Sequence, residues 1–287
     1  MVGCGNMAGA MLEGWLAAGI DPRLVTVIRP SGRVPAEGVR VLTAPPEDEV
    51  PALVLLGVKP QKLDEIAPGL AAALDPATIL VSILAGVELA SLRARFPVPR
   101  AVVKAMPNLP VAFGQGVVEL HTDAASPAPA REAVEALMRP LGLALWFDDE
   151  PLLNVASALT AAAPAFLFRF LDALAEAGAA LGLPPQQAAR LAAEMAAGAA
   201  ALAARSGETP AALARRVASP GGTTEAGLAI LDSPDGLRPL LLRTLEASRR
   251  RGRELAAASR ESRPGRSRAL GARFYGIGQF GDEGEVG

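Results

Sequence analysis

The sequence predicts an α/β protein in which a parallel-sheet domain is followed by an all-helical domain. Short apolar or β-branched runs alternate with helix-like segments through the first half, as in parallel βαβ units. After Asp148–Asp149 the strand signals vanish and Ala- and Leu-rich helical patterns take over. Aromatic residues make up only 4% of the chain, which favours closely packed helices over an aromatic-rich β-sandwich. We therefore expect domains over residues 1–149 and 150–258.

Each element of the first domain is expected from an apolar run or a helical pattern. The strand runs are nearly continuous in apolar character, which fits a sheet covered on both faces. They are Leu24–Ile28, Leu53–Val58, Thr78–Ile83, Arg100–Lys104, Val117–Leu120 and Ala144–Phe147. The helical segments are Met7–Ala18, Lys62–Ala73, Leu89–Phe96 and Pro129–Arg139.

The second domain begins with a long helix over Leu152–Leu181, disturbed at Pro164 and stopped by Gly182. Its apolar run Leu152–Phe168 is interrupted by polar residues and is shorter than the roughly 20 residues of a membrane span, so we expect a buried helix. Further helices are expected over Gln186–Ala204, Pro210–Val217, Thr224–Leu231 and Gly236–Ala258. Residues 259–287 lack periodicity and predict a disordered tail.

Bulk properties exclude several classes of function. The formal net charge is −2, which gives no indication of a nucleic-acid or anionic-membrane partner. With one cysteine, Cys4, and one histidine, His121, an intrachain disulfide is impossible and a Cys/His zinc site is not expected. No charged leader precedes an apolar run, so no signal peptide is expected. We therefore expect a soluble cytoplasmic protein without a metal.

The N-terminal segment Gly3-Cys4-Gly5-Asn6-Met7-Ala8 matches the pattern G-x-G-x-x-G/A at the start of a helix. The first glycine allows a tight turn, the second lets the backbone approach a pyrophosphate, and the small last residue lets helix and strand pack closely. The helix N-terminus adds free N–H donors and the positive end of its dipole. Together with the βαβ alternation, the motif predicts a Rossmann-type, dinucleotide-binding domain.

The loop after the second expected strand favours NADPH, with NADH also accepted. An NAD enzyme usually has Asp or Glu there to bind the ribose 2′-hydroxyl, whereas this chain has Arg29, Ser31 and, nearby, Arg33. A guanidinium and a hydroxyl suit a 2′-phosphate. A solvated loop with chance basic residues is the alternative.

The fingerprint begins at Gly3, so only Met1 and Val2 precede it. The strand that should lead into the turn needs about five residues and is central in this fold. We hypothesise that the natural chain starts upstream of Met1.

A second glycine-rich cluster, Ser219–Leu228, opens one of the expected helices. Read structurally, it is a helix start at which Ser or Thr caps free N–H groups. Read functionally, Gly221 and Gly222 expose backbone N–H groups that bind a small carboxylate, while neighbouring hydroxyls bond a ring nitrogen. The spacing alone leaves both interpretations open.

From Val2 to Leu255 the chain resembles pyrroline-5-carboxylate reductase. The resemblance rests on several motifs in the same order. They are the fingerprint, Val58-Lys59-Pro60-Gln61, Ser82–Gly86, Met106-Pro107-Asn108-Leu109-Pro110 and Ser219–Leu228. It implies the last step of proline biosynthesis, in which NAD(P)H reduces L-1-pyrroline-5-carboxylate to L-proline. It also implies a homodimer or higher oligomer formed through interlocked helical domains.

The resemblance also assigns residues to the site. It adds Val58, Lys59, Pro60, Met106 and Asn108 to the cofactor-binding residues Gly3, Gly5, Asn6, Met7, Arg29 and Ser31 that the fingerprint and the basic loop predict. The substrate would be held by Ser219, Gly221, Gly222, Thr223 and Thr224. Thr224 matches the threonine that hydrogen-bonds the ring nitrogen, so it is the expected catalytic residue. Lys59 is expected to act through its backbone rather than as an acid, and His121 is expected at the surface.

The chain departs from the family where Ala161–Ala163 replaces Gly-Ser-Gly, Phe166 replaces Tyr, and Ala44 replaces Asn. Two alternatives therefore stay open: a related imine reductase and a degenerate NADP(H)-binding protein. A β-hydroxyacid dehydrogenase is disfavoured, because such enzymes use a helix-borne lysine and no Lys follows Lys104.

Overall fold

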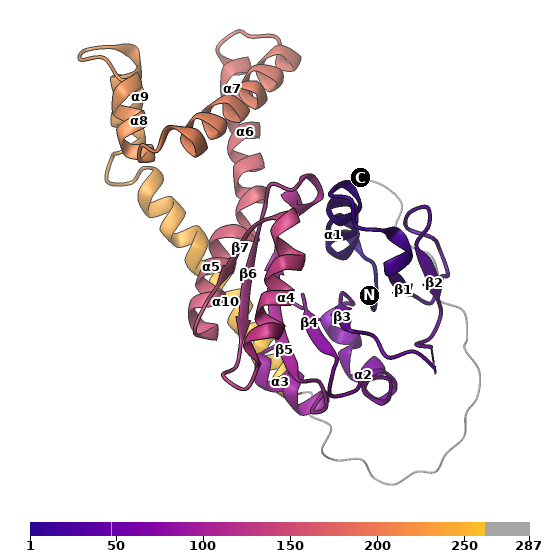
Figure 1. Cartoon of the computed structure of the whole chain (residues 1–287). Helices are drawn as coiled ribbons and strands as arrows, with labels where there is room; N and C mark the ends of the chain where they lie inside the picture. Colours follow the sequence, from indigo (N-terminus) through magenta and orange to yellow (C-terminus); the bar gives the residue numbers. More distant parts are fainter. Residues whose placement is uncertain (47, 262–287) are drawn as a thin grey trace.

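The computed structural model describes residues 1–46 and 48–261 and has a sheet domain with a helical arm (Figure 1). The strands are β1 (Thr26–Ile28), β2 (Arg40–Leu42), β3 (Leu53–Leu56), β4 (Ile79–Ser82), β5 (Ala101–Pro107), β6 (Gly116–Thr122) and β7 (Gly142–Trp146). They form a pair, β1-β2, and a five-stranded sheet in the order β3-β4-β5-β6-β7. An α/β domain followed by a helical domain is the fold class that the sequence predicts.

The sheet is mostly but not wholly parallel, because β5 and β6 pair antiparallel, with Met106 opposite Glu119. Parallel neighbours need a crossover of about a dozen residues or more. Only residues 108–115 separate these two strands, so the chain has to turn straight back. The sequence pattern predicts neither this reversal nor the three-residue strand β2.

Four α-helices cover the two faces of the sheet. They are α1 (Asn6–Ala17), α2 (Leu63–Ala72), α3 (Leu89–Arg95) and α4 (Ala128–Met138). Short 3₁₀ turns lie at Pro22–Leu24, Pro60–Lys62, Leu109–Phe113 and Arg139–Leu141. One buried apolar cluster joins the sheet to α1 and α4, and another joins it to α2 and α3. The helices therefore form where the apolar periodicity places them.

Val2 occupies the centre of the sheet between β1 and β3. It forms isolated parallel bridges to Ile28 and to Leu56. Its N–H donates to the carbonyl of Leu55 (2.8 Å), and its carbonyl accepts from the N–H of Gly57 (2.9 Å). On the other side, the carbonyl of Met1 accepts from the N–H of Ile28 (2.8 Å) and the N–H of Gly3 donates to the carbonyl of Ile28 (2.9 Å). Residues 1–3 thus join the β1-β2 pair to the larger sheet at the position of the central strand.

The helical arm consists of α5 (Glu150–Thr160), α6 (Ala163–Ala180), α7 (Pro185–Ser206), α8 (Pro210–Val217), α9 (Thr223–Leu231) and α10 (Leu237–Glu261). Helices α6 and α7 pack as a hairpin that leads away from the sheet, and α10 returns beside α5. Helices α8 and α9 lie at the end of the arm that is farthest from the sheet (Figure 1). The expected long helix is broken at Ala161–Ala162. The tail expected from residue 259 lies largely outside the described residues, and α10 continues to Glu261.

The expectation that Leu152–Phe168 is buried is wrong for the single chain. Leu159, Leu167 and Phe168 are among its large apolar residues that are about half exposed or more. Among the described residues, one segment, Glu150–Ala180, is long and apolar enough to cross a membrane. A helix that packs against another subunit can have the same length and composition. The exposed apolar side chains of this segment therefore indicate a surface that a partner covers.

Candidate active site

The fingerprint turn depends on a close backbone crossing. Gly3 has φ +83°, and a Cβ there would lie 2.8 Å from the carbonyl oxygen of Gly57. A Cβ on Gly57 would lie 2.8 Å from the Cβ of Ala8, which is buried at the start of α1. Small residues at all three points therefore let helix α1, the turn and the end of β3 pack together.

The start of α1 forms an open cradle for an anion. Gly5 is the N-cap residue, and a Cβ added there would meet no atom within 4 Å. No side chain caps the helix, so the N–H groups of Asn6 and Met7 stay available. Open space beside a free helix N-terminus suits a pyrophosphate.

The basic loop lies close to this turn, at the end of β1. Burial raises the pKa of the Cys4 thiol, and the Arg29 guanidinium acts against that rise because it lies near Cys4. Arg29 also donates to the carbonyl of Arg33 (3.4 Å), while the Ser31 hydroxyl is exposed. The residues of the fingerprint and those expected to bind a 2′-phosphate are therefore neighbours.

Residues Val58, Lys59 and Pro60 follow β3 directly. A Cγ of Val58 would lie 2.9 Å from a Cβ on Gly3, so this segment borders the fingerprint turn. Lys59 is exposed, and its extended backbone precedes the 3₁₀ turn that begins at Pro60. The segment is positioned to touch a cofactor through its backbone.

A cleft of about 1120 Å³ lies between the sheet domain and the helical arm. Its lining includes Ala85, Gly86 and Met106 from the carboxyl ends of β4 and β5, and Ser157 and Ala161 from α5. Asn108 does not line this cleft. Its side chain donates to the carbonyl of Thr160 (3.2 Å) and accepts from the N–H of Val117 (2.9 Å), so it ties β5, β6 and α5 together.

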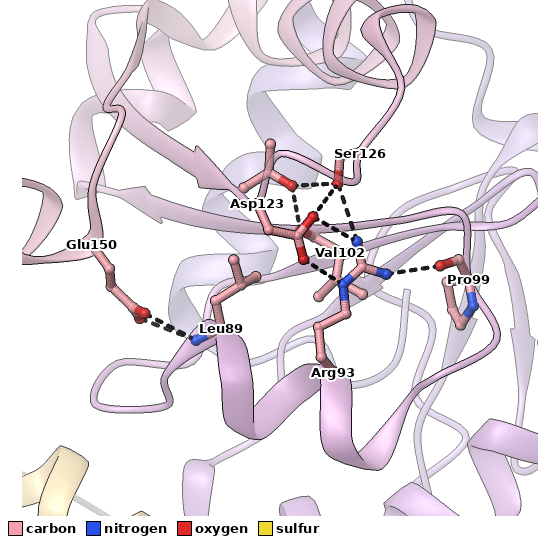
Figure 2. Close-up of polar contacts among 8 residues, drawn as sticks. Leu89, Arg93, Pro99, Val102, Asp123, Ser126 and Glu150 are labelled. Atoms are coloured by element: carbon pink, nitrogen blue, oxygen red, sulfur yellow. Dashed lines mark hydrogen bonds and ion pairs between the residues drawn. The ribbon is translucent and has the colours of Figure 1, made fainter.

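A buried ion pair that was not expected from the sequence lies at this cleft. Lys104, only 3% exposed, pairs with Glu150 at the start of α5. The Glu150 carboxylate also accepts from the N–H of Leu89 (3.1 Å), which opens α3 (Figure 2). This carboxylate thus joins the arm to both β5 and α3. A lysine inside an otherwise apolar strand is the signal that could have found it.

A second polar network stabilises the far end of α3. Arg93 donates to both oxygens of Asp123 (2.8 and 3.0 Å) and to the carbonyl of Pro99 (2.9 Å), and Ser126 joins the same cluster (Figure 2). The Arg93 guanidinium holds the pKa of the Asp123 carboxyl below its usual value. This network lies away from the fingerprint and serves to fix the fold.

The second glycine cluster forms the start of α9. Gly221 has φ +68°, a conformation that favours glycine, and a Cβ on Gly222 would meet the hydroxyl and the carbonyl oxygen of Ser219. Gly222 is the N-cap and no side chain caps the helix from that position. Instead, the Glu225 carboxylate accepts from the N–H of Gly221 (2.7 Å). A carboxylate already binds one N–H of this turn, so the backbone geometry suits an anion.

The two halves of the expected site do not meet within one chain. The fingerprint lies in the sheet domain, whereas Ser219–Thr224 lies at the tip of the arm (Figure 1). The residues lining the interdomain cleft come from the sheet domain, α5, α6 and α10, and none belongs to the Ser219–Thr224 turn. A substrate that touches both motifs therefore needs a second copy of the chain.

Two other expectations can be compared with the structure. His121 is buried, not at the surface, and its Nδ1 bonds the carbonyl of Phe147 (2.9 Å). At the two positions where the family has glycine, Ala161 at the α5–α6 corner has right-handed helical backbone angles and Ala163 is the first residue of helix α6. Alanine adopts these angles without strain, so the missing glycines do not disturb this corner.

Beneath the cleft, Glu119 on β6 is a buried carboxyl group. Thr160 donates a hydrogen bond to its Oε1, and the Ser157 hydroxyl also lies beside this carboxyl group. Loss of solvation raises the pKa of Glu119 to about 7. This group therefore gains its charge only near neutral pH. Within residues 1–46 and 48–261, no group of three or more His, Cys, Asp or Glu side chains is placed to hold a metal ion.

A fingerprint domain joined to a helical arm defines the class of NAD(P)-dependent oxidoreductases. A family model described as NADP oxidoreductase, coenzyme F420-dependent, matches residues 1–86, and one described as pyrroline-5-carboxylate reductase dimerisation matches residues 150–255. The N-terminal part is therefore an NADP-binding domain, and the helical arm is a dimerisation domain. The arm that carries the exposed apolar surface is the part of the chain that this dimerisation model matches.

The pyrroline-5-carboxylate reductase of Pseudomonas aeruginosa is 36% identical over 261 residues, covering 89% of this chain and 95% of that protein. The structure of the Coxiella burnetii pyrroline-5-carboxylate reductase superposes with a TM-score of 0.81 at 29% identity, over 89% and 97% of the two chains. A Plasmodium falciparum pyrroline carboxylate reductase with NADP bound shares the fold, with a TM-score of 0.77 at 20% identity over 89% and 97%. The chain belongs to the pyrroline-5-carboxylate reductase family.

Glu119 predicts a specific dependence of stability on pH. Its pKa is raised from 4.5 to about 7, so between these values the folded state binds more protons than the unfolded state. The unfolding free energy therefore falls as pH rises through this window, by up to about 3 kcal/mol. The substitution Glu119→Gln should remove this decrease in the unfolding free energy. The variant should therefore be more stable than the parent at about pH 8. Thermal melts across the window measure it, with Glu37→Gln at the exposed surface as the control. Parallel stability curves for parent and E119Q would contradict the role of Glu119.

Proposed function

We propose that this protein reduces L-1-pyrroline-5-carboxylate to L-proline with NADPH, the last step of proline biosynthesis. The observation that carries the proposal is the pair of glycine turns at helix starts. One, at Gly3–Gly5, suits a pyrophosphate, and the other, at Gly221–Gly222, suits a small carboxylate. A chain of this family that has both turns has a binding position for the cofactor and one for the substrate of this reaction.

In this reaction the main task of the protein is to align the cofactor with the substrate. When bound, NADPH supplies a hydride to the imine carbon, and a proton on the ring nitrogen completes the amine. The free N–H groups at the start of α9 bind the substrate carboxylate, and the Thr224 hydroxyl orients the ring nitrogen. Glu225 gives up its contact with Gly221 as the substrate carboxylate enters. Holding two reactants in register is enough to account for a large rate gain.

The active unit that we propose is a homodimer, or a higher oligomer built from it. One chain presents its fingerprint and Arg29, and its partner presents the turn that contains Thr224. The separation of these motifs within one chain and the exposed apolar surface of the arm support this arrangement. We further propose a cytoplasmic location, which a chain with one cysteine fits.

Purified protein with NADPH and L-1-pyrroline-5-carboxylate should lose absorbance at the nicotinamide band. Thr224→Ala should lower kcat by about a hundredfold, because the ring nitrogen loses its oriented hydroxyl, and leave NADPH affinity unchanged. Thr224→Ser retains a hydroxyl and should recover most of the activity. Turnover only with other cyclic imines, or equal kcat for T224A and the parent, would overturn the assignment.

The cofactor preference should depend on Arg29. Arg29→Asp removes a charge-assisted contact to the 2′-phosphate and adds repulsion, so KM for NADPH should rise about 10- to 100-fold while KM for NADH changes little. Steady-state kinetics with both cofactors measure the effect. Arg100→Asp, an exposed change at the opposite end of the sheet, is the control. An equal rise in KM for NADPH and NADH would contradict a contact between Arg29 and the 2′-phosphate.

The shared site can be tested by mixing two inactive variants. Gly5→Asp places a carboxylate in the open pyrophosphate position without a steric clash, and Thr224→Ala disables the substrate turn. In a mixed dimer, one site combines the intact fingerprint of one chain with the intact Thr224 of the other. Co-expressed chains should therefore recover about a quarter of the parent activity. Activity no greater than that of the separate variants would show that each site is built from one chain.

A further inference from the structure

The cleft between the sheet domain and the arm lies where the nicotinamide end of the cofactor would reach. A dinucleotide bound to this fold lies across the carboxyl ends of the parallel strands. With its pyrophosphate at the start of α1 and its 2′-phosphate near Arg29, beyond β1, its other end would extend over β3 towards β4 and β5. Gly86, which follows β4, and Met106, near the end of β5, both line the cleft. The cleft therefore forms the surroundings of the nicotinamide ring.

Glu119 lies beneath this cleft, on the same face of the sheet as Met106. The two residues are directly opposite in the antiparallel pair of β5 and β6, so their side chains point to the same side. The adjacent residues Ala105 and Leu120 point to the other side, into the apolar cluster beneath α1 and α4. Glu119 is only 1% exposed, and Ser157, which lies beside its carboxyl group, lines the cleft. A buried carboxyl group thus lies under the floor of the cleft.

Hydroxyl groups, and no cation of the described residues, contact this carboxyl group. Thr160 bonds its Oε1, and the Ser157 hydroxyl lies beside it. Lys104, on the same face of β5, pairs with Glu150 and not with Glu119. Further titratable or charged groups that share this face or line the cleft are His121 on β6, Glu88 before α3, and Arg243, Arg249, Arg251 and Arg253 on α10. An ionised Glu119 would therefore be a buried charge without a directly bound cation.

The contacts of Thr160 favour a proton on Glu119. The Thr160 hydroxyl lies within hydrogen-bonding distance of the Glu119 carboxyl group and of the carbonyl of Ala156 (3.0 Å). Its single proton serves only one of these two acceptors at a time. When Glu119 is protonated, the carboxyl group donates to Thr160 and Thr160 donates to Ala156, so both contacts are hydrogen bonds. Burial raises the pKa of Glu119 to about 7, which makes both protonation states accessible at neutral pH.

Oxidation of the cofactor changes the charge in the cleft. The dihydronicotinamide ring of NADPH is neutral, whereas the nicotinamide ring of NADP⁺ carries a positive charge. A cation that loses solvation in a cleft is unfavourable unless an anion lies near it. The buried Glu119 carboxylate has the complementary requirement, because it lacks a cation. Each charge therefore offsets the desolvation cost of the other.

We propose that Glu119 is the counter-charge of the oxidised nicotinamide: it is protonated beside NADPH and ionised beside NADP⁺. Only the O–H bond of its carboxyl group breaks, the proton leaves to solvent, and the carboxylate takes a proton back when NADP⁺ dissociates. Glu119 acts through its charge and forms no bond with the substrate. The inference rests on the proposed function for the placement of the nicotinamide in this cleft, and it holds whichever imine the protein reduces.

Proton release on cofactor binding tests the proposal without any substrate. Calorimetric titrations with NADP⁺ and with NADPH are repeated in buffers that differ in their ionisation enthalpy, which gives the number of protons released. At pH 7 about half of Glu119 is protonated, so NADP⁺ should release about 0.4 proton per site more than NADPH. The comparison cancels the titration of the 2′-phosphate that both cofactors carry.

Glu119→Gln retains the shape of the side chain but cannot ionise, so it should abolish the difference between the two cofactors. Glu37→Gln, at the exposed surface, is the matched control and should leave the difference unchanged. Equal proton release with NADP⁺ and NADPH in the parent protein would overturn the proposal. A difference that persists in E119Q would also overturn it, because another group would then be the source of the proton.

The pH dependence of affinity gives a second measurement. NADP⁺ favours the ionised form of Glu119, so its Kd should fall as pH rises from about 5.5 to about 8.5, by about tenfold more than the Kd for NADPH. In E119Q the two pH profiles should be parallel. Parallel profiles in the parent protein would contradict the role of Glu119. A lack of turnover with L-1-pyrroline-5-carboxylate would instead contradict the proposed function, since these binding measurements contain no imine.

Discussion

The backbone crossing at Gly3 and Gly57 is the constraint on which the nucleotide-binding half of the molecule depends. The two glycines pass so closely that neither tolerates a Cβ, and Ala8 packs against the second of them. This contact fixes the end of β3, the fingerprint turn and the first turn of α1 as one unit. The open helix start, Arg29 and the Val58–Pro60 segment all take their positions from it. The two residues that lead into the crossing pair with both neighbouring strands, so the central strand position governs the turn.

The arm depends on a different feature, which is the large apolar side chains that it exposes. Helices α5, α6 and α10 expose large apolar side chains, and the tip of the arm holds the second glycine turn far from the sheet. In the homodimer that we propose, a partner covers the apolar surface and brings the turn to a fingerprint, which fits the match of the arm to a dimerisation domain. The buried Lys104–Glu150 pair, with the N–H of Leu89, holds the base of the arm to the sheet domain.

Much of the fold could be predicted from the sequence because its signals are local. The apolar runs locate β3, β4 and β5, and the helical periods locate α1, α8 and α9, with boundaries that differ by a few residues. The glycine turns are equally visible, since Gly3 and Gly221 stand where positive φ is required.

The remaining features depend on contacts between distant residues. The reversal at β6 follows from a connection too short for a crossover, and the burial of His121 follows from its bond to Phe147. Lys104 meets Glu150 only after the arm has docked on the sheet. Likewise, no local pattern distinguishes a helix buried in its own chain from one buried by a partner, which is why Leu152–Phe168 was expected inside.

The most direct test of the account is a crystal structure of the protein with NADPH and L-proline bound. We predict that the proline carboxylate contacts the backbone N–H groups of the Gly222–Thr224 turn of one protomer. The nicotinamide ring that faces this proline should belong to the cofactor held by the Gly3–Gly5 turn of the other protomer. Proline bound away from the Gly222–Thr224 turn, or a cofactor and a substrate turn from the same chain at one site, would contradict the account.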